Sequence, residues 1–210
     1  MIGFQENSFS KSFQDDFYRR ASTGTLSKSG KAKNFPKKDI CLLGDVTVGK
    51  SFIFEKFTGK KGDSDINAAE TQMTLTYSEH GNIHWKYLAA KFWDIKPYPY
   101  EAILKDKISN CHLIIIVYSS QNRESLESIE NYWIPAYLSE KIPKIFIRNT
   151  RNRLKPHVSE QQGKSLAKKY NALHLEFFND EETIQNCLRE IGIFALCSKK
   201  REKSSSCCLM

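Results

Sequence analysis

Residues Gly44–Ser51 read GDVTVGKS, in which a glycine is followed, after four residues, by Gly-Lys-Ser. The apolar run ICLL precedes this stretch and FIFEKF follows it, so a buried strand should lead into a loop and a helix should leave it. The two glycines would let the backbone curl until several N–H groups converge on phosphate oxygens at a helix N-terminus. Lys50 would then reach the β- and γ-phosphates, and the Ser51 hydroxyl would face Mg²⁺. The pattern therefore predicts a phosphate-binding loop.

The composition is that of an ordinary globular domain, with 210 residues, 40% of them hydrophobic and 27% charged. A net charge of +8 favours an anionic partner such as phosphate, a lipid headgroup or nucleic acid. No apolar run approaches the roughly 20 residues of a membrane-spanning helix. The start has neither the layout of a signal peptide nor the second-position glycine of a myristoylation site, because Ile2 stands there. Cys41 and Cys111 fall in apolar runs, so we expect buried, reduced thiols in a reducing compartment.

The N-terminal segment differs from the rest of the chain in composition. Residues 1–36 are rich in Ser, Lys, Asn and Gln, so we expect a disordered extension. Within it Phe9, Phe13 and Phe17 recur at every fourth residue. This spacing leaves two alternatives, a structureless tail or a short aromatic helix over 8–19 that packs on the domain or on a partner.

Between residues 37 and 198, strand signals and helix signals alternate, and we expect a single nucleotide-binding domain there. The runs DICLLG, CHLIIIVYSS, KIPKIFIRN and ALHLEFF have the character of buried strands. TQMTLTYSE and IHWKYLAAKFWD flank the turn HGN and predict a hairpin. Ser159 and Gln162 have capping-box spacing and should open a helix. The alternation predicts an α/β fold, a mostly parallel six-stranded sheet with helices on both faces and one antiparallel edge.

Three segments carry a resemblance to a known family. LLGDVTVGKSFIFEKF is similar to the first strand, loop and helix of the Ras superfamily of small GTPases. KFWDIKPYPYEAI resembles the stretch with Trp-Asp-Thr-Ala-Gly-Gln in Rab and Rho proteins, and LIIIVYSSQNRESLESIENYW resembles the fourth strand and its helix. The resemblance covers about residues 38–198 and is greatest to the Rab branch. It implies the P-loop small-GTPase fold and binding of GTP/GDP with Mg²⁺.

The resemblance also assigns roles to individual residues. Lys50 and Ser51 match the phosphate lysine and the Mg²⁺ serine, and Asp94 matches the aspartate that holds Mg²⁺, usually through water. For the threonine that closes over the γ-phosphate, Thr71 stands at the family distance before Asp94, and Thr74 is the alternative. The implied metal ligands are Ser51, Thr71 and Asp94. The implied cofactor-binding residues are Gly44, Asp45, Val46, Thr47, Val48, Gly49, Lys50, Ser51, Phe52, Thr71, Asn149 and Asn152.

The segment after Asp94 departs from the family. Where the family has Thr-Ala-Gly-Gln, this chain has Ile-Lys-Pro-Tyr. The family glycine gives its N–H to the γ-phosphate, whereas Pro97 has no N–H, and Tyr98 has no amide with which to orient the attacking water. Val46 places a branched apolar side chain where an arginine finger would enter. We therefore expect hydrolysis to be slow or absent.

The base-recognition motif is also altered. The family sequence Asn-Lys-x-Asp appears here as NTRN: Asn149 is retained, Thr150 replaces the lysine and Asn152 replaces the aspartate. That aspartate accepts two hydrogen bonds from guanine, whereas an amide offers one acceptor and one donor, so selectivity for guanine should fall. The family's Ser-Ala-Lys motif is missing, and FFND stands near its place.

The basic tail over 199–210 ends in CCLM, which fits a prenylation signal loosely. Cys207 alone would be farnesylated, or Cys207 and Cys208 would both be geranylgeranylated, as in some Rab proteins. Lys199–Lys203 supplies a second, electrostatic signal toward anionic lipid. We expect this tail to attach the chain to the cytoplasmic face of a membrane, with a cytosolic pool. No basic surface interleaved with aromatic residues points to a nucleic acid partner.

Three functions stay open at the level of the sequence. The first is an atypical Rab-like GTPase, a membrane-anchored switch in vesicle trafficking or signalling that meets effector proteins through segments 58–78 and 94–109. The second is a pseudo-GTPase scaffold that does not cycle nucleotide. The third is a P-loop phosphotransferase, which would need an Arg-rich lid that the residues between Asp94 and Cys111 do not offer.

Overall fold

The computed structural model describes residues 35–79, 82–137, 142–150 and 155–198. Four predicted features lie outside these residues: the possible helix over 8–19, Asn152, Lys199–Lys203 and the pair Cys207 and Cys208. The elements in chain order are β1 (Lys37–Leu43), α2 (Lys50–Thr58), β2 (Ile66–Glu79), β3 (Asn82–Ile95), α3 (Pro97–Asn110), β4 (Leu113–Ser119), α4 (Arg123–Ser128), the π-helix η1 (Ile129–Trp133), α5 (Ile134–Tyr137), β5 (Lys144–Asn149), α6 (Glu160–Lys169), β6 (Leu173–Phe177) and α7 (Glu181–Cys197).

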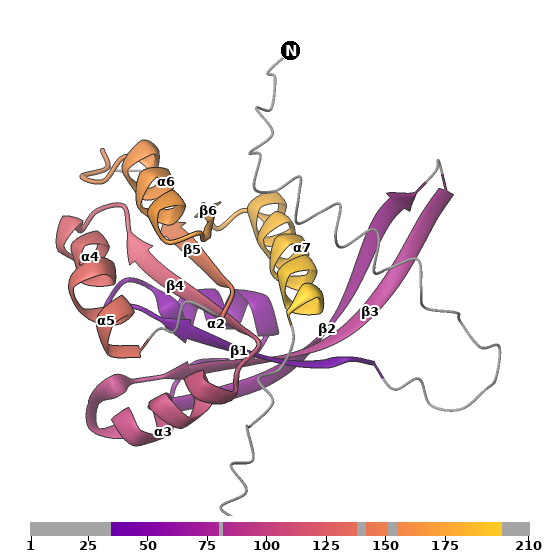
Figure 1. Cartoon of the computed structure of the whole chain (residues 1–210), viewed down its shortest axis with the longest axis horizontal. Coiled ribbons are helices and arrows are strands. Elements are labelled where there is room, and N and C mark those ends of the chain that lie inside the picture. Colours follow the sequence, from indigo (N-terminus) through magenta and orange to yellow (C-terminus); the bar gives the residue numbers. More distant parts are fainter. Residues whose placement is uncertain (1–34, 80–81, 138–141, 151–154, 199–210) are drawn as a thin grey trace, which may run out of the picture.

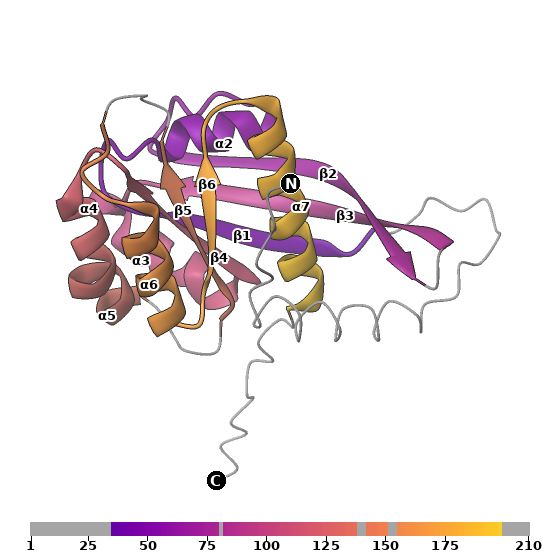
Figure 2. The ribbon, with the colours of Figure 1, turned by 90° about the horizontal axis from the view of Figure 1, so that it is seen from above.

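A six-stranded sheet in the order β2-β3-β1-β4-β5-β6 forms the centre of the molecule (Figure 1). β2 and β3 pair antiparallel, from Ile66 opposite Ile95 to Glu79 opposite Asn82. The other neighbouring strands pair parallel. The far end of the β2–β3 hairpin extends beyond the rest of the sheet (Figure 2). The predicted mostly parallel, six-stranded sheet with one antiparallel edge is confirmed.

Helices cover both faces of the sheet, as the alternation predicted. α2 and α7 contribute Phe54 and Ile191 to the core on one face, and α3 and η1 contribute Leu104 and Ile129 to the core on the other. β4 is buried along almost its whole length because both faces of the parallel sheet are covered. Cys41 and Cys111 are buried free thiols, which confirms the expected burial. Within the described part of the chain, no helix combines the length and the apolar character needed to cross a bilayer.

The segment after β4 differs from the single helix that its sequence suggests. α4 begins at the N-cap Asn122, whose side chain accepts hydrogen bonds from the next turn, but the helix then widens into η1 before continuing as α5. A π-helical turn contains more residues than an α-helical one, and such turns recur at functional sites. The predicted capping box of Ser159 and Gln162 is present at the start of α6.

β1, β3, β4, β5 and β6 run parallel, so their carboxyl ends meet at one edge of the sheet. Ligands of open α/β sheets bind at this edge. It carries the loop after β1, Asp94 near the end of β3, and Asn149 at the end of β5.

Candidate functional site

The phosphate loop, residues Gly44–Ser51, joins β1 to α2 with a tightly curled backbone. Gly44 and Gly49 have φ angles of 135° and 94°. A Cβ atom on Gly44 would lie 2.2 Å from the carbonyl oxygen of Val117, and one on Gly49 would lie 2.2 Å from the Nδ2 atom of Asn149. Glycine is therefore required at both positions, by backbone angle and by space. The loop packs this closely against β4 and β5 at the entry to a helix.

The Lys50 side chain is buried at the centre of the loop, with 9% of its surface exposed. Its Nζ donates hydrogen bonds to the carbonyl oxygens of Gly44 and Asp45, at 2.7 and 2.6 Å. Burial lowers its pKa, while the carboxylates of Asp94 and Asp45 oppose this change. An ammonium group has three donors, so Lys50 can meet a phosphate oxygen as well as the loop.

Ser51 and Asp94 bring two hard oxygen donors together beside Lys50. The Ser51 hydroxyl donates to the Oδ2 atom of Asp94 at 2.7 Å, and Asp94 is only 3% exposed. Mg²⁺ binds few protein oxygens and completes its shell with waters and substrate phosphates. A hydroxyl and a carboxylate next to a phosphate loop fit this requirement, so Ser51 and Asp94 are the residues that would hold the ion.

Thr71 and Thr74 are not brought to this pair. Thr71 lies opposite Ala90 in the hairpin, and its hydroxyl donates to the Phe57 carbonyl oxygen at 3.2 Å. Its partner precedes Asp94 by four residues, which is about 13 Å along a strand. Thr74 is farther still, opposite Tyr87. The family distance fails here because β2 already begins at residue 66, so the loop before it is short.

The residues next to Asp94 are ones that sequence reasoning missed. Asn67 stands opposite Asp94 in the hairpin, and its Oδ1 atom accepts from the Ser64 N–H and hydroxyl, at 3.1 and 2.8 Å. Gly62 lies against Ser51, since a Cβ on Gly62 would be 3.0 Å from that of Ser51. Counting back from the HGN turn predicted in the sequence could have paired Asn67 with Asp94. Of the expected segment 58–78, most is strand β2, and the loop at the site is 59–65.

The β2–β3 ladder also continues past Asp94. The Lys96 N–H donates to the Asp65 carbonyl oxygen at 2.9 Å, and the Lys96 Nζ donates to the Asp65 carboxylate at 2.5 Å. The loop before β2 and the segment after β3 are thus joined to each other directly.

Asn149, the residue expected to face the base, ends β5, and Phe177 ends β6; together with Thr150 and Phe178 they are called the base end of the site. The Asn149 Nδ2 donates to the Val48 carbonyl oxygen at 2.8 Å and so ties β5 to the phosphate loop. Both the N–H and the hydroxyl of Thr150 donate to the Phe177 carbonyl oxygen at 2.9 Å. Phe178 is 50% exposed beside them. Phe52, at the start of α2, packs edge-on against Phe177.

Comparison with known protein families agrees with this geometry. The model of the Ras family matches residues 39–191, more than half of the chain. The chain belongs to the Ras family. No curated protein matches the sequence with significant similarity. Small GTPases of this family generally bind guanine nucleotide with Mg²⁺, and the matched region contains the phosphate loop, Asp94 and Asn149.

Next to the base end, this Ras-family domain contains a buried network of polar side chains from β4, β5 and β6. Arg148 donates through Nε and Nη2 to the Val158 carbonyl oxygen, at 3.0 and 2.6 Å, and through Nη1 to Glu176 at 2.7 Å. The Tyr118 hydroxyl and His174 Nε2 are hydrogen-bonded at 2.9 Å. Burial raises the pKa of Glu176 to about 7, although Arg148 opposes it, and lowers the pKa of His174 to about 4. Burial also raises the pKa of Tyr118.

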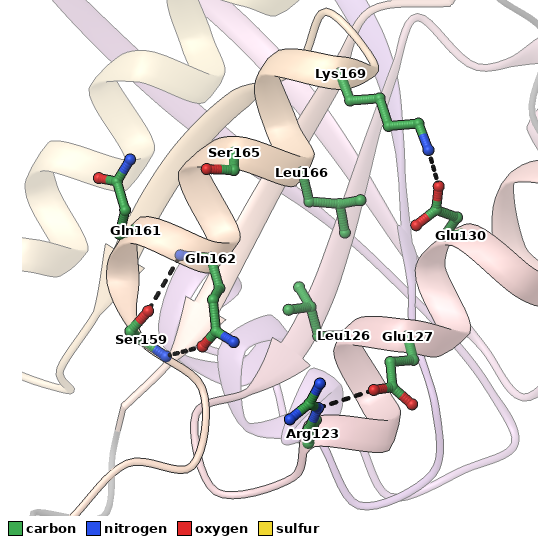
Figure 3. A pocket seen from close by; sticks show the side chains of 10 residues that line it. All are labelled: Arg123, Leu126, Glu127, Glu130, Ser159, Gln161, Gln162, Ser165, Leu166 and Lys169. Atoms are coloured by element: carbon green, nitrogen blue, oxygen red, sulfur yellow. Dashed lines mark hydrogen bonds and ion pairs between the residues drawn. The ribbon is translucent and has the colours of Figure 1, made fainter.

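A groove of about 450 Å³ lies between α4 and α6 (Figure 3). Leu126 and Leu166 face each other across it, and its sides carry the ion pairs Arg123–Glu127 and Lys169–Glu130. None of the residues that line it belongs to the phosphate loop, nor do they include Asp94 or Asn149. The groove is therefore separate from the nucleotide site of the Ras-family fold.

Proposed function

We propose that this Ras-family domain binds guanine nucleotide with Mg²⁺ and acts as an atypical, Rab-like molecular switch with slow or absent hydrolysis. The observation that supports this most is the 2.7 Å contact between Ser51 and Asp94 beside the buried Lys50. Few roles other than binding a polyphosphate with a hard cation call for this combination at a helix N-terminus.

The chain's own groups would divide the work as follows. The N–H groups of the phosphate loop and the Lys50 ammonium would bind phosphate oxygens, and Ser51 and Asp94 would hold Mg²⁺, which would neutralise phosphate charge when bound. Asn149 would face the base from β5, with its Nδ2 already fixed by the Val48 carbonyl. Because Asn149 touches the loop, the base and phosphate sites are mechanically linked.

The proposal of slow hydrolysis rests on the segment after Asp94. Pro97 is the first residue of α3 and has no N–H to offer a γ-phosphate. Tyr98 is 83% exposed, so its ring is turned toward solvent instead of being packed over the site. Val46 in the phosphate loop is 76% exposed, and its apolar side chain would meet an incoming arginine.

The cellular part of the proposal rests on the tail and the segments near Asp94. CCLM with Lys199–Lys203 supports attachment by a prenylated C-terminus to the cytoplasmic face of a membrane, with a cytosolic pool. A role in vesicle trafficking or signalling follows from the Rab-like resemblance. Effector proteins would bind at the segments 58–78 and 94–109, of which 59–65 and the start of α3 border the site.

The test is nucleotide content and affinity of the full-length chain. We expect the purified protein to retain GDP or GTP, to lose it on chelation of Mg²⁺, and to hydrolyse bound GTP in single turnover more slowly than ordinary family members. Lys50→Ala should abolish retention, and the exposed Lys168→Ala should not. Undetectable binding of guanine nucleotide by the wild-type chain would contradict the proposal.

A second function, a scaffold whose surface does not depend on nucleotide, is favoured by the Asp65–Lys96 contacts. They join the two segments near the site directly, through the chain's own groups. For a scaffold, partner proteins captured with the GDP-loaded and GTP-analogue-loaded chain would be the same. For a switch, capture would differ between the two forms.

A further inference from the structure

The phosphate loop accepts a hydrogen bond from a tryptophan that is distant in sequence. The Trp133 Nε1–H donates to the Oδ1 atom of Asp45 at 2.7 Å, across 88 residues of chain. The indole is buried, with 2% of its surface exposed. The main-chain carbonyl of the same Asp45 accepts a hydrogen bond from Lys50. Asp45 is thus fixed through both its side chain and its backbone.

The π-helix η1 places this tryptophan. Trp133 is the last residue of η1, and the turn closes with the Ile134 N–H on the Ile129 carbonyl oxygen. Two tyrosine rings, Tyr132 and Tyr137, pack on the indole at centroid distances of 5.1 and 5.5 Å. The extra residue in a π-turn rotates the following side chains relative to an uninterrupted α-helix. The unusual turn and the aromatic packing together fix the indole with its N–H on Asp45.

A second contact holds the other half of the loop. Asn149 Nδ2 bonds to the Val48 carbonyl oxygen, two residues beyond the exposed Val46. Between these two anchors Thr47 has a φ of 70°, a conformation that side chains other than glycine rarely adopt. A loop with unfavourable backbone angles keeps its curl only where surrounding contacts enforce it. Trp133 and Asn149 supply such contacts at its two ends.

We propose that Trp133 is a positioning residue for phosphate binding. By fixing Asp45, it keeps the loop N–H groups converged when the third donor of the Lys50 ammonium binds a phosphate oxygen. The inference rests on the proposed function, because it assumes that the loop binds a polyphosphate. Hydrogen bonds to a charged acceptor are stronger than neutral ones, so loss of this bond should have a measurable effect.

The experiment measures the affinity of the full-length chain for GDP and for inorganic tripolyphosphate by calorimetry. Trp133→Phe removes the donor and keeps an aromatic side chain, and Asp45→Ala removes the acceptor. We expect each to weaken both ligands by about tenfold, since each removes one charge-assisted bond. The double variant should be no weaker than either single variant, because both break the same contact. Asp45→Asn keeps an acceptor oxygen and should stay within about threefold of wild type.

A chemically matched control exists in the same fold. Trp93 Nε1 donates to Asp39 Oδ1 at 3.1 Å, also from a tryptophan to an aspartate, but outside the loop. Trp93→Phe should change the melting temperature without changing either affinity. If Trp133→Phe and Asp45→Ala behaved like this control, or if their losses multiplied in the double variant, the inference would be overturned.

The two ligands separate this inference from the proposed function. Binding of tripolyphosphate without binding of GDP would contradict a guanine switch, and the role of Trp133 would still be decided by the inorganic ligand. If the wild-type chain bound neither, both proposals would fail together.

Discussion

The phosphate end and the base end of the site differ in how many of the groups needed for nucleotide binding are in place. At the phosphate end, the phosphate loop and Asp94 provide the glycines, the buried ammonium and the paired oxygens. At the base end, Asn149 is in place, but Thr150 uses both of its donors on the Phe177 carbonyl oxygen. We infer that nucleotide affinity comes mainly from the phosphate end, and that selectivity among bases is weak.

The largest expected effect comes from breaking the phosphate end. Lys50→Met removes the buried ammonium while keeping much of its aliphatic stem, and we expect GDP and GTP affinity to fall by at least about 100-fold, the loss of two or more charge-assisted contacts. Fluorescence titration with a labelled nucleotide measures this. Lys168→Met, on the exposed face of α6, serves as the control. A loss below about tenfold at Lys50 would show that the phosphate end does not carry the affinity.

The second effect concerns the segment between the two ends. Restoring a glycine and a glutamine with Pro97→Gly and Tyr98→Gln returns one N–H donor and one amide to the γ-phosphate side. We expect the single-turnover rate of GTP hydrolysis to rise by up to about 100-fold, because removal of one preorganised donor slows other enzymes by about 100- to 1,000-fold. Nucleotide affinity should change little, which affinity titration of the same variant checks. An unchanged rate would mean that these two departures do not limit hydrolysis.

A third, smaller effect would sharpen the comparison from the base end. Asn152→Asp restores the acceptor pair for guanine, so the ratio of GDP to ADP affinity should rise by about tenfold or more, as expected when a mismatched polar group is corrected. Competition against a labelled nucleotide gives the ratio. Asn171→Asp adds the same charge after α6 and should leave it unchanged. Equal ratios in all three proteins would place base selectivity elsewhere.

The order of strands and helices could be predicted because most strands have a clear apolar pattern in the sequence. β4 is an almost continuous apolar run of the kind that a doubly covered sheet requires, and β5 has an apolar centre at residues 145–147. The Gly44–Ser51 spacing locates the loop between the first strand and helix. The hairpin was recognisable from its turn. The features that a local sequence pattern specifies, namely the strands, the phosphate loop and the hairpin, were therefore predicted from the sequence.

The rest of the site depends on contacts that no local pattern encodes. Thr71 was expected at the metal site from family spacing, but that distance presumes a loop length that only the register of β2 on β3 reveals. The same register places Asn67 beside Asp94. The bond between Trp133 and Asp45 depends on the π-turn, and the helical periodicity of the surrounding residues conceals it. Such long-range pairings become visible only once the elements are packed.

The smallest expected effect concerns His174 and Glu176 in β6, two buried groups whose contributions to stability change with pH in opposite directions. His174, with its pKa lowered to about 4, binds fewer protons in the folded chain, so its contribution to stability rises with pH between 4 and its usual value. Glu176, with its pKa raised to about 7, binds more protons in the folded chain, so its contribution falls as pH rises toward 7. The charged or titratable groups around the pair are Tyr118, Arg148, Glu160, Lys164 and Cys187.

These opposite slopes should nearly cancel in the wild-type chain between pH 4.5 and 6.5, and single variants should reveal them. With Glu176→Gln, the free energy of unfolding in urea should rise with pH over this range, because only His174 remains. With His174→Gln, it should fall as pH rises through the range, because only Glu176 remains. The exposed Glu182→Gln should keep the wild-type profile. Arg148 directly precedes Asn149, so GDP affinity measured in the same buffers tests whether these two groups also influence the base end. If GDP affinity changes with pH in parallel with the free energy of unfolding, they do. If GDP affinity does not change with pH, the two groups affect stability alone.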